Sequence, residues 1–410
     1  GLSIWKEKVP GKKKSRKFLW QLSNSPKEDQ TKQDIYSLNK IVLMLTSDYD
    51  LEFTKTFLMT YQSFTTPSVL LNKLYQRFAV PPDVDTRTAS TVQLRVAVTL
   101  KRWVETQFVD FDEEMVDRLL FFIEKITIAN QTLGDSLRDA VSVQLQERSQ
   151  KIAEQLDISI EDFDFSTTPS SDTPIELFLN FSEEESARQI TLIMFDLFEA
   201  INVTTEMLNQ CWHKAKQRAP GVIQFLHYAN ALAHWVPTLI LAQKELAQRV
   251  LVINKFIKIA QCFRKANNYQ ALHAVLRGLS MPCILRLKQT LEKIDSKLWQ
   301  STLAQEKIFS SASSYKAYNT LITRAQKPLI PFLQADLNTL IAIEEGNSSD
   351  NLNDSSPSSS SSTSTSVSAS NEQIVDFKKS KQIFRVLDAI QNYQNTAYDY
   401  PLVEPINSYL

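Results

Sequence analysis

Glycine is scarce in this chain of 410 residues, which contains only 6 of them. No two of these glycines lie close enough together to form the glycine-rich loop that cradles a nucleotide phosphate. The sequence also lacks the G-x-S-x-G motif, the turn that exposes the nucleophilic serine of many hydrolases. These absences argue against a nucleotide-hydrolysing enzyme and against a serine hydrolase.

Cysteine and histidine are equally rare, with 3 and 4 residues. Cys211, Cys262 and Cys283 are far apart and form no CxxC pair, so buried thiols in a reducing compartment explain them better than disulfides. His227 and His234 are seven residues apart, but no third ligand follows at a metal-binding spacing. We therefore expect no metal site and no cofactor.

The chain also lacks a strong net charge and a long hydrophobic run. Its 45 basic and 46 acidic residues give a formal charge of −1, so no overall field draws it to nucleic acid. No segment approaches the roughly 18 to 20 apolar residues that span a bilayer, and no apolar signal core begins the chain. We expect a cytoplasmic protein and, because the sequence starts with Gly1 rather than Met, a piece of a longer polypeptide.

Basic residues are concentrated in residues 1–34, which we predict to be a flexible leader. It carries aromatic residues among the basic ones, namely Trp5, Phe18 and Trp20 among Lys6, Lys8, Lys12, Lys13, Lys14, Arg16 and Lys17. Such a mixture suits peripheral contact with anionic lipid. It also suits a solvated leader that packs one tryptophan on the next domain, and we favour this second interpretation.

Helical periodicity dominates the rest of the chain and predicts an all-α fold. Leu38, Ile41, Val42 and Leu45 repeat at intervals of three and four, as the buried face of a helix does. Thr66 and Pro67 are typical of an N-cap and a first helical residue. Further amphipathic runs follow over Leu94–Val104 and Met115–Ile128. We expect a small helical domain over residues 35–165.

A larger helical domain is predicted over residues 170–410, with the smaller domain packed on it. The linker composition of residues 164–174 separates the two. Serine dominates residues 348–370, which cannot bury enough apolar area to offset their ordering entropy. We predict this stretch to be a disordered insert, because a further helix follows it over Phe377–Tyr393.

The segment Pro328–Gly346 breaks a local rule at its end. Its apolar residues form one helical stripe, and Gly346 is expected to stop the helix in the left-handed conformation. Glu344 and Glu345 occupy the last turn, where the helix dipole disfavours each carboxylate by roughly 0.3 to 1 kcal/mol. Such a conflict indicates either a functional site or a solvated acidic turn, and the residues alone leave both open. Ile341 shares a face with Glu345, four residues on.

Two sets of sequence blocks resemble domains of one known family. The blocks Asp50–Pro67 and Leu70–Phe78 resemble the N-terminal exchanger-motif domain of the Ras-family guanine nucleotide exchange factors. The blocks that resemble its catalytic exchange domain are Ser186–Phe198, Leu208–Trp212, Val250–Phe263, Asn267–Leu279, Arg286–Leu287, Pro331–Phe332, Glu344–Asn347 and Ile390–Asn395. Their order and spacing make chance similarity very improbable, and together they cover nearly all of residues 35–410.

The resemblance implies a protein that ejects GDP from a Ras or Rap GTPase without covalent chemistry, and so is not an enzyme in the usual sense. It implies that Pro328–Gly346 belongs to a protruding helical hairpin that opens the nucleotide site. Ile341 then matches the apolar residue placed where the bound magnesium sat. Glu345 matches the carboxylate that disturbs the phosphate-binding backbone. Recruitment to the membrane that carries the GTPase would follow.

The resemblance also implies a pocket that grips the second switch of the GTPase. The residues assigned to GTPase binding are Leu226, His227, His273, Ser280, Tyr315, Phe332 and Asn338. His273 stands where the family has an aliphatic residue and His227 where it has a basic one, so GTPase preference is expected to differ. Plain helical core is the competing interpretation of these residues. A non-catalytic GTPase-binding module and an unrelated helical scaffold are the alternative functions.

Overall fold

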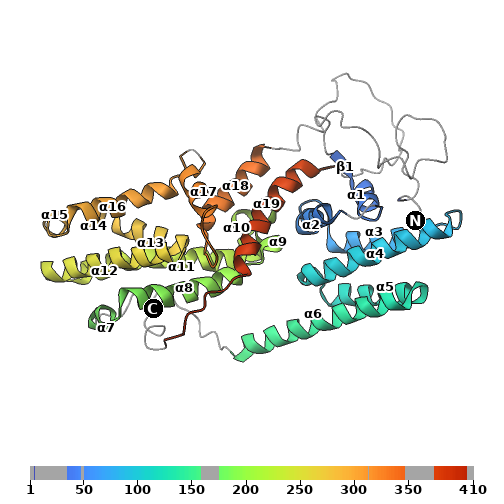
Figure 1. The fold of residues 1–410 in the computed structure, drawn as a ribbon, viewed down its shortest axis with the longest axis horizontal. Helices are drawn as coiled ribbons and strands as arrows, with labels where there is room; N and C mark the ends of the chain where they lie inside the picture. Colours follow the sequence, from blue (N-terminus) through green and yellow to red (C-terminus); the bar gives the residue numbers. More distant parts are fainter. Residues whose placement is uncertain are drawn as a thin grey trace, which may run out of the picture. The chain divides into compact units, whose positions relative to one another are not determined.

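The computed structural model describes Ile4 and residues 35–47, 50–157, 175–312, 314–346 and 374–403. Nearly all of the predicted leader, the linker and the serine-rich insert lie outside these residues. The chain divides into two compact units, which are coloured along the sequence in Figure 1. Unit 1 comprises Gly1–Ile160 and Asn347–Phe384, and unit 2 comprises Glu161–Gly346 and Arg385–Leu410. The predicted domain boundaries themselves stay predictions.

Helices account for almost all regular structure, which confirms the all-α prediction. The helices of unit 1 are α1 (Leu38–Leu45), α2 (Leu51–Thr60), α3 (Pro67–Phe78), α4 (Thr86–Thr106), α5 (Glu113–Ala129) and α6 (Gln131–Asp157), with short 3₁₀ turns η2 (Tyr61–Ser63) and η3 (Phe108–Asp110). Helices α1 to α5 each begin at a residue whose side chain accepts a backbone N–H of the first turn, as N-caps do: Ser37, Asp50, Thr66, Asp85 and Asp112. The cap predicted at Thr66 is among them.

A buried carboxylate ties three parts of unit 1 together. The Asp110 carboxylate accepts hydrogen bonds from the Tyr61 hydroxyl at 2.6 Å, the Trp103 indole N–H at 2.7 Å and the Gln62 amide at 2.5 Å. Burial nevertheless raises the pKa of Asp110, since desolvation outweighs these donors. These hydrogen bonds join η3 to α4 and to η2, the turn after α2, at the centre of the unit's core.

The described residues also contain a pair of strands that the sequence did not predict. β1 (Ile35–Ser37) pairs antiparallel with β2 (Ile374–Asp376), and Tyr36 lies opposite Val375. Phe377 follows β2 and packs on Phe53 of α2, with ring centroids 4.4 Å apart. The residues after the serine-rich segment therefore complete the core of unit 1.

Unit 2 contains the remaining helices. They are α7 (Ile175–Asn180), α8 (Glu183–Glu199), α9 (Val203–Glu206), α10 (Cys211–Lys214), α11 (Pro220–Ala242), α12 (Leu246–Lys265), α13 (Tyr269–Leu279), α14 (Pro282–Leu285), α15 (Lys288–Leu291), α16 (Ser296–Glu306), α17 (Lys316–Ile322) and α18 (Leu333–Gly346), with 3₁₀ turns η4 (Leu208–Gln210), η5 (Lys216–Arg218) and η6 (Lys307–Phe309). Helix α19 (Phe377–Gln394) begins in unit 1 and ends in unit 2.

Helix α13 is the central helix of unit 2, packed against α11, α12 and α16. Gly278 permits the close approach to α11, because a Cβ atom there would lie 2.6 Å from the Ala233 carbonyl oxygen. Ala271, Leu272, Val275 and the other apolar residues of α13 are fully buried. This helix therefore provides a rigid base for the residues around it.

Helix α18 (Leu333–Gly346) begins five residues later than the predicted segment Pro328–Gly346 and also ends differently from the prediction. Gly346 is its last described residue and does not have the left-handed backbone expected of a glycine stop. The helical hydrogen bonds simply continue to this residue, so the expectation was wrong. No helix in the described part of the chain is both long enough and apolar enough to cross a membrane.

Candidate functional site

Five aromatic side chains of unit 2 form what we call the aromatic cluster. Its members are His273 on α13, Phe309 on η6, Tyr315 and Tyr318 around the start of α17, and Phe332 just before α18. The His273 ring lies 4.3 Å from that of Phe332 and 5.1 Å from that of Phe309, measured between centroids. Phe332 also contacts Tyr315 at 6.1 Å and Tyr318 at 5.9 Å. Phe332 is therefore the centre of the cluster.

Hydrogen bonds join the cluster to α18. The Asn338 amide donates to the Tyr315 hydroxyl, and the Gln334 amide donates to the Asn338 side-chain oxygen at 2.9 Å. Tyr315 itself has a left-handed backbone, with φ of 58°, which few residues other than glycine adopt at no cost. This unusual conformation places its ring at the N-terminus of α17, within reach of α18.

His273 is uncharged in this setting. Burial lowers its pKa to about 4, and the nearby positive charge of Arg277 adds to the effect. A neutral imidazole can pack among phenyl rings without the desolvation penalty that an imidazolium would suffer. The histidine therefore serves as an aromatic member of the cluster at neutral pH.

The start of α18 is held by two side chains from other helices. The Phe332 N–H donates to the Tyr318 hydroxyl at 2.7 Å, and the Leu333 N–H donates to the Gln270 side-chain oxygen at 3.0 Å. All four residues are buried. Because the first N–H groups of a helix have no partner within it, these acceptors satisfy groups that burial would otherwise leave unpaired.

The backbone before α18 is fastened to α13 as well. The Tyr269 N–H donates to the Ile330 carbonyl at 2.9 Å, and the Ile330 N–H donates to the Asn267 carbonyl at 3.1 Å. Sequence reasoning missed Gln270 and Tyr318 as functional candidates. One signal was available, because the first N–H groups of a helix need hydrogen-bond acceptors. Gln270 lies within the matched block Asn267–Leu279, and Tyr318 is three residues after Tyr315, so both are near residues that were named.

The far end of α18 carries the two residues predicted to act on the nucleotide site. Ile341 is half-buried and Glu345, one turn later, is exposed. Glu344 is largely buried, with 14% of its side chain exposed, and its carboxylate lies 3.9 Å from the Lys214 amine on α10. Helix α18 also packs against η4, where Asn209 has a left-handed φ of 56°. The helix is thus supported near both ends.

One carboxyl oxygen in the first turn of α18 is buried without a hydrogen-bond partner among the described residues. The Oδ2 atom of Asp336 is buried, although the residue as a whole is partly exposed. Burial raises the pKa of this carboxyl to about 7.

No group of three or more His, Cys, Asp and Glu side chains is placed to hold a metal ion within the described ranges.

The structure brings together four of the predicted GTPase-binding residues, namely His273, Tyr315, Phe332 and Asn338. Ser280 lies at the end of α13, where its hydroxyl donates to the Glu306 carboxylate of α16 at 3.0 Å. Leu226 is half-buried and His227 exposed on α11. The roles assigned to all seven residues, and to Ile341 and Glu345, stay predictions.

Comparison with known proteins identifies the family. The model of the RasGEF domain matches residues 185–393, and that of the RasGEF N-terminal motif matches residues 34–126. The first match includes the aromatic cluster and α18, and the second includes α1 to α4 and most of α5. The chain belongs to the family of Ras guanine nucleotide exchange factors.

Relatives in Dictyostelium discoideum match almost the whole chain. It is 34% identical over 387 residues to Ras guanine nucleotide exchange factor S, a match that covers 91% of this chain and 36% of the relative. It is 34% identical to factor R, covering 96% of this chain and 22% of the relative. It is 32% identical to factor A, covering 100% and 67%. The chain therefore spans between about a fifth and two thirds of these relatives.

Proposed function

We propose that this chain binds a Ras-type small GTPase, opens its nucleotide site and so promotes GDP release and GTP loading. The proposal rests on one observation, the way in which other helices hold α18 in place. Its first residues are bonded to Tyr318 and Gln270, and its far end bears Ile341 and Glu345. A helix fixed at its base can hold its far end against a partner. Ras, which the relatives' names include, and the closely similar Rap proteins are the candidate substrates.

The proposed mechanism is a wedge and involves no covalent chemistry. Ile341 would occupy the place of the magnesium ion, and its apolar side chain cannot replace the oxygen ligands that the ion requires. Glu345 would approach the backbone N–H groups that bind the phosphates and compete with the phosphate charge. Exchanger and nucleotide would then weaken each other's binding by reciprocal coupling.

The aromatic cluster is proposed to anchor the GTPase. Tyr315 is at the edge of burial, with 9% of its surface exposed, while Phe332 at the centre of the cluster is 4% exposed. Aromatic residues are enriched among those that carry most of the binding energy at protein interfaces, and Tyr315 is the member of this pair that a partner can reach. We propose that His273 and His227, which depart from the family pattern, shift the preference among GTPases. Leu226, Ser280 and Asn338 would complete the contact surface.

The proposed setting is the cytoplasm, with recruitment to the membrane where the GTPase resides. The basic leader is the proposed membrane contact, and nearly all of it lies outside the described residues. Binding of the chain to vesicles that contain anionic lipid, compared with a variant whose leader lysines are replaced by glutamine, tests this part separately. Loss of exchange activity in solution would not bear on it.

Release of fluorescent GDP from purified Ras and Rap proteins tests the proposed function. The chain is expected to accelerate release, and an Ile341→Ala/Glu345→Ala variant is expected to lose most of the acceleration. Thr339→Ala is the matched control, because Thr339 is exposed on α18 but lies about 200° around the helix from Ile341. Equal loss in both variants would refute the assigned roles.

The alternative function, a non-catalytic GTPase-binding module, gives a different result. Such a module would bind the GTPase through the aromatic cluster yet leave GDP release unchanged. A pull-down of nucleotide-free GTPase separates this outcome from an unrelated helical scaffold, which would form no complex. Acceleration of release by the unaltered chain contradicts both.

A further inference from the structure

A groove between α3 and α5 of unit 1 is separate in sequence and in structural unit from the candidate exchange site in unit 2. It encloses a cavity volume of about 330 Å³ and is lined by Leu71, Asn72, Tyr75, Asp117, Arg118, Phe121 and Phe122. Leu71 and Phe122 form its buried floor, whereas Tyr75 and Phe121 are 38% and 53% exposed. The Tyr75 and Phe122 rings meet edge to face, with centroids 5.2 Å apart. The groove thus presents aromatic walls to the surroundings.

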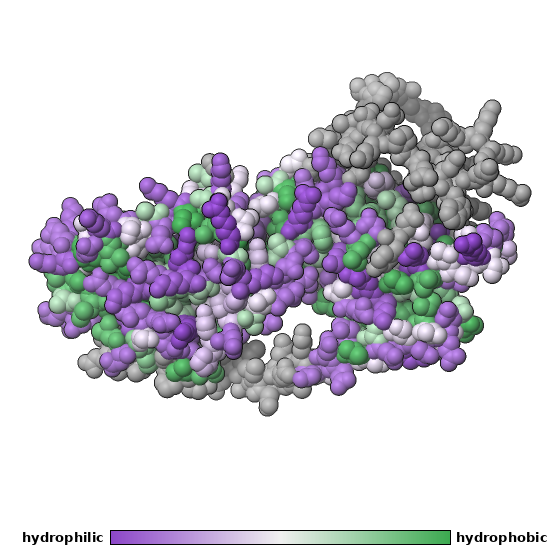
Figure 2. All heavy atoms as spheres, in the orientation of Figure 1, coloured by the Kyte–Doolittle hydropathy of each residue, from purple (hydrophilic) through white to green (hydrophobic). Residues whose placement is uncertain are grey.

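The same two helices expose other apolar side chains outside the groove lining. Val69 on α3 is 40% exposed, and Leu120 and Ile128 on α5 are 37% and 80% exposed. Figure 2 shows hydrophobic side chains at the surface over α5, among mainly hydrophilic neighbours. Apolar groups gathered around a groove are typical of a site that another molecule covers.

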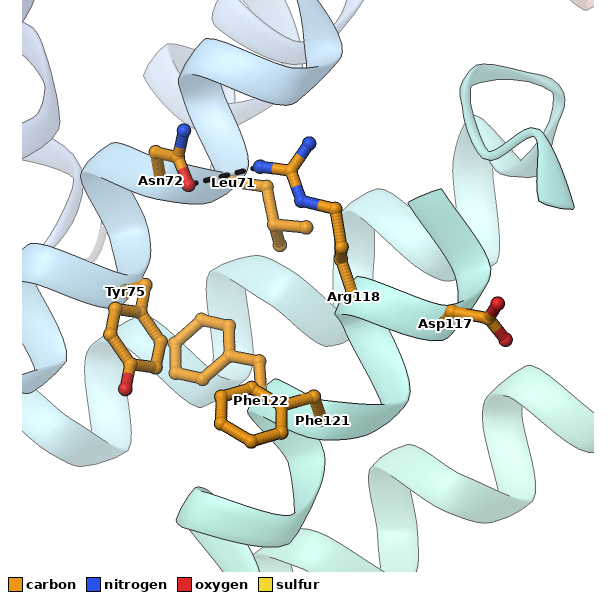
Figure 3. A pocket seen from close by; sticks show the side chains of 7 residues that line it. All are labelled: Leu71, Asn72, Tyr75, Asp117, Arg118, Phe121 and Phe122. Carbon is orange, nitrogen blue, oxygen red and sulfur yellow. Dashed lines mark hydrogen bonds between the residues drawn. The ribbon is translucent and has the colours of Figure 1, made fainter. Parts of the chain in front are cut away.

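A positive charge stands at the edge of this apolar surface. The Arg118 guanidinium donates to the Ser68 hydroxyl at 2.7 Å and to the Asn72 side-chain oxygen at 3.0 Å. Figure 3 shows its side chain beside Leu71, with the guanidinium turned toward Asn72. Both acceptors are neutral, and no described carboxylate lies within 4.0 Å of this group. Its position is fixed, but its charge is not neutralised.

A second cation flanks the aromatic wall on the same helix. The Lys125 amine lies 5.1 Å from the centre of the Phe121 ring. Arg118 and Lys125 are seven residues apart and so share one face of α5, about 10.5 Å apart along its axis. The carboxylate of Asp117 points away from the groove, as Figure 3 shows. Along α5, the aromatic ring of Phe121 therefore lies between the positive charges of Arg118 and Lys125.

We propose that this groove binds a short segment of a partner protein, in which a large aromatic or aliphatic side chain is flanked by aspartate or glutamate. The apolar side chain would enter between Tyr75 and Phe121. A flanking carboxylate would pair with Arg118, whose remaining N–H groups suit the two oxygens of a carboxylate. The neutral acceptors Ser68 and Asn72 hold the guanidinium in place beforehand, which reduces the entropy lost on binding. A basic segment would meet repulsion at both ends.

Selection of random twelve-residue peptides displayed on phage, with the full chain as bait, tests the proposal. The library is first depleted on the Phe121→Ser variant, which removes peptides that bind elsewhere. Enriched peptides are expected to share an aromatic or aliphatic residue with acidic neighbours. Enrichment of basic peptides, or no enrichment over the depleted library, would overturn the proposal.

The affinity of the best enriched peptide, measured by fluorescence anisotropy, assigns the contacts. Phe121→Ser and Arg118→Gln are each expected to weaken binding about tenfold or more, as interface anchors do. Val143→Ser is the matched control, because Val143 is also 53% exposed in unit 1 but lies on α6. Both groove residues are at least partly exposed, so the variants should fold, and circular dichroism checks this.

Two other outcomes would contradict the proposal. Equal binding by all three variants would place the peptide outside the groove. Concentration-dependent dimerisation of the chain that Phe121→Ser abolishes, measured by analytical ultracentrifugation, would assign the groove to a second copy instead. GDP release is measured in parallel without peptide. Because the groove variants leave unit 2 unaltered, failure of the exchange activity and failure of peptide binding are distinguishable.

Discussion

Replacement of Gln270 by leucine tests how α18 is held. The side-chain oxygen of Gln270 is the acceptor of the buried Leu333 N–H, at 3.0 Å. Leucine fills a similar volume but accepts no hydrogen bond, so the N–H group is left buried and unpaired. An unsatisfied group of this kind costs about 1 to 3 kcal/mol. For a domain of the size of unit 2, this corresponds to a fall in Tm of roughly 2 to 12 °C.

The same variant separates stability from function. At a temperature below the measured Tm of the variant, unit 2 of Gln270→Leu should remain folded while the start of α18 gains freedom. GDP release from Ras at a saturating concentration of the variant is therefore expected to slow severalfold. Tyr318→Phe, which removes the hydroxyl that accepts the Phe332 N–H at 2.7 Å, is expected to behave in the same way.

Gln289→Leu is the matched control for this substitution. Gln289 is exposed on α15, so its change to leucine is expected to shift Tm by less than about 2 °C. A Gln270→Leu variant with an unchanged Tm and an unchanged rate of GDP release would refute the reasoning. A fall in Tm without any slowing would show that the bond stabilises unit 2 but does not position α18.

Three further predictions concern buried groups of unit 2. The pKa of His273 is lowered to about 4, so stability falls as the pH drops from about 6.5 toward 4, and His273→Leu should reduce that fall in urea unfolding. The pKa of Asp336 is raised to about 7, so its contribution makes stability fall as the pH rises from about 4 to 7. Asp336→Asn should make stability depend less on pH in this range. Gly278→Ala places a methyl group 2.6 Å from the Ala233 carbonyl oxygen and should destabilise unit 2 by about 1 to 3 kcal/mol in thermal unfolding, whereas Gly346→Ala, with no atom within 4 Å, should not. Equal stability of the two glycine variants would contradict the assignment at Gly278. A pH dependence of stability that is unchanged in His273→Leu or Asp336→Asn would contradict the assignment of that residue.

Local patterns in the sequence were sufficient to predict the helices. Thr66 and Pro67 predicted the start of α3 because a cap and its helix are neighbours in sequence. The strand pair was not predictable in this way. β1 and β2 are only three residues each, and Ile35 pairs with Asp376 across most of the chain, so neither strand has a periodic signal of its own.

The candidate site was predictable only as far as residue type and family resemblance reach. His273, Tyr315, Phe332 and Asn338 were named from the sequence, and the structure places them together. The partners that hold α18 could not be named, because the bond of Gln270 to Leu333 depends on packing between distant segments. The failed expectation at Gly346 has a similar cause: glycine permits a left-handed stop but does not require one.

The central claim is that α18 opens the nucleotide site of a GTPase. Its most direct test is the rate of fluorescent GDP release from Ras and Rap with the unaltered chain, with Ile341→Ala/Glu345→Ala and with Thr339→Ala. We expect acceleration by the unaltered chain and by Thr339→Ala, and its loss in the double variant. Acceleration that survives in the double variant would contradict the wedge. No acceleration of any GTPase by the unaltered chain would contradict the proposed function itself.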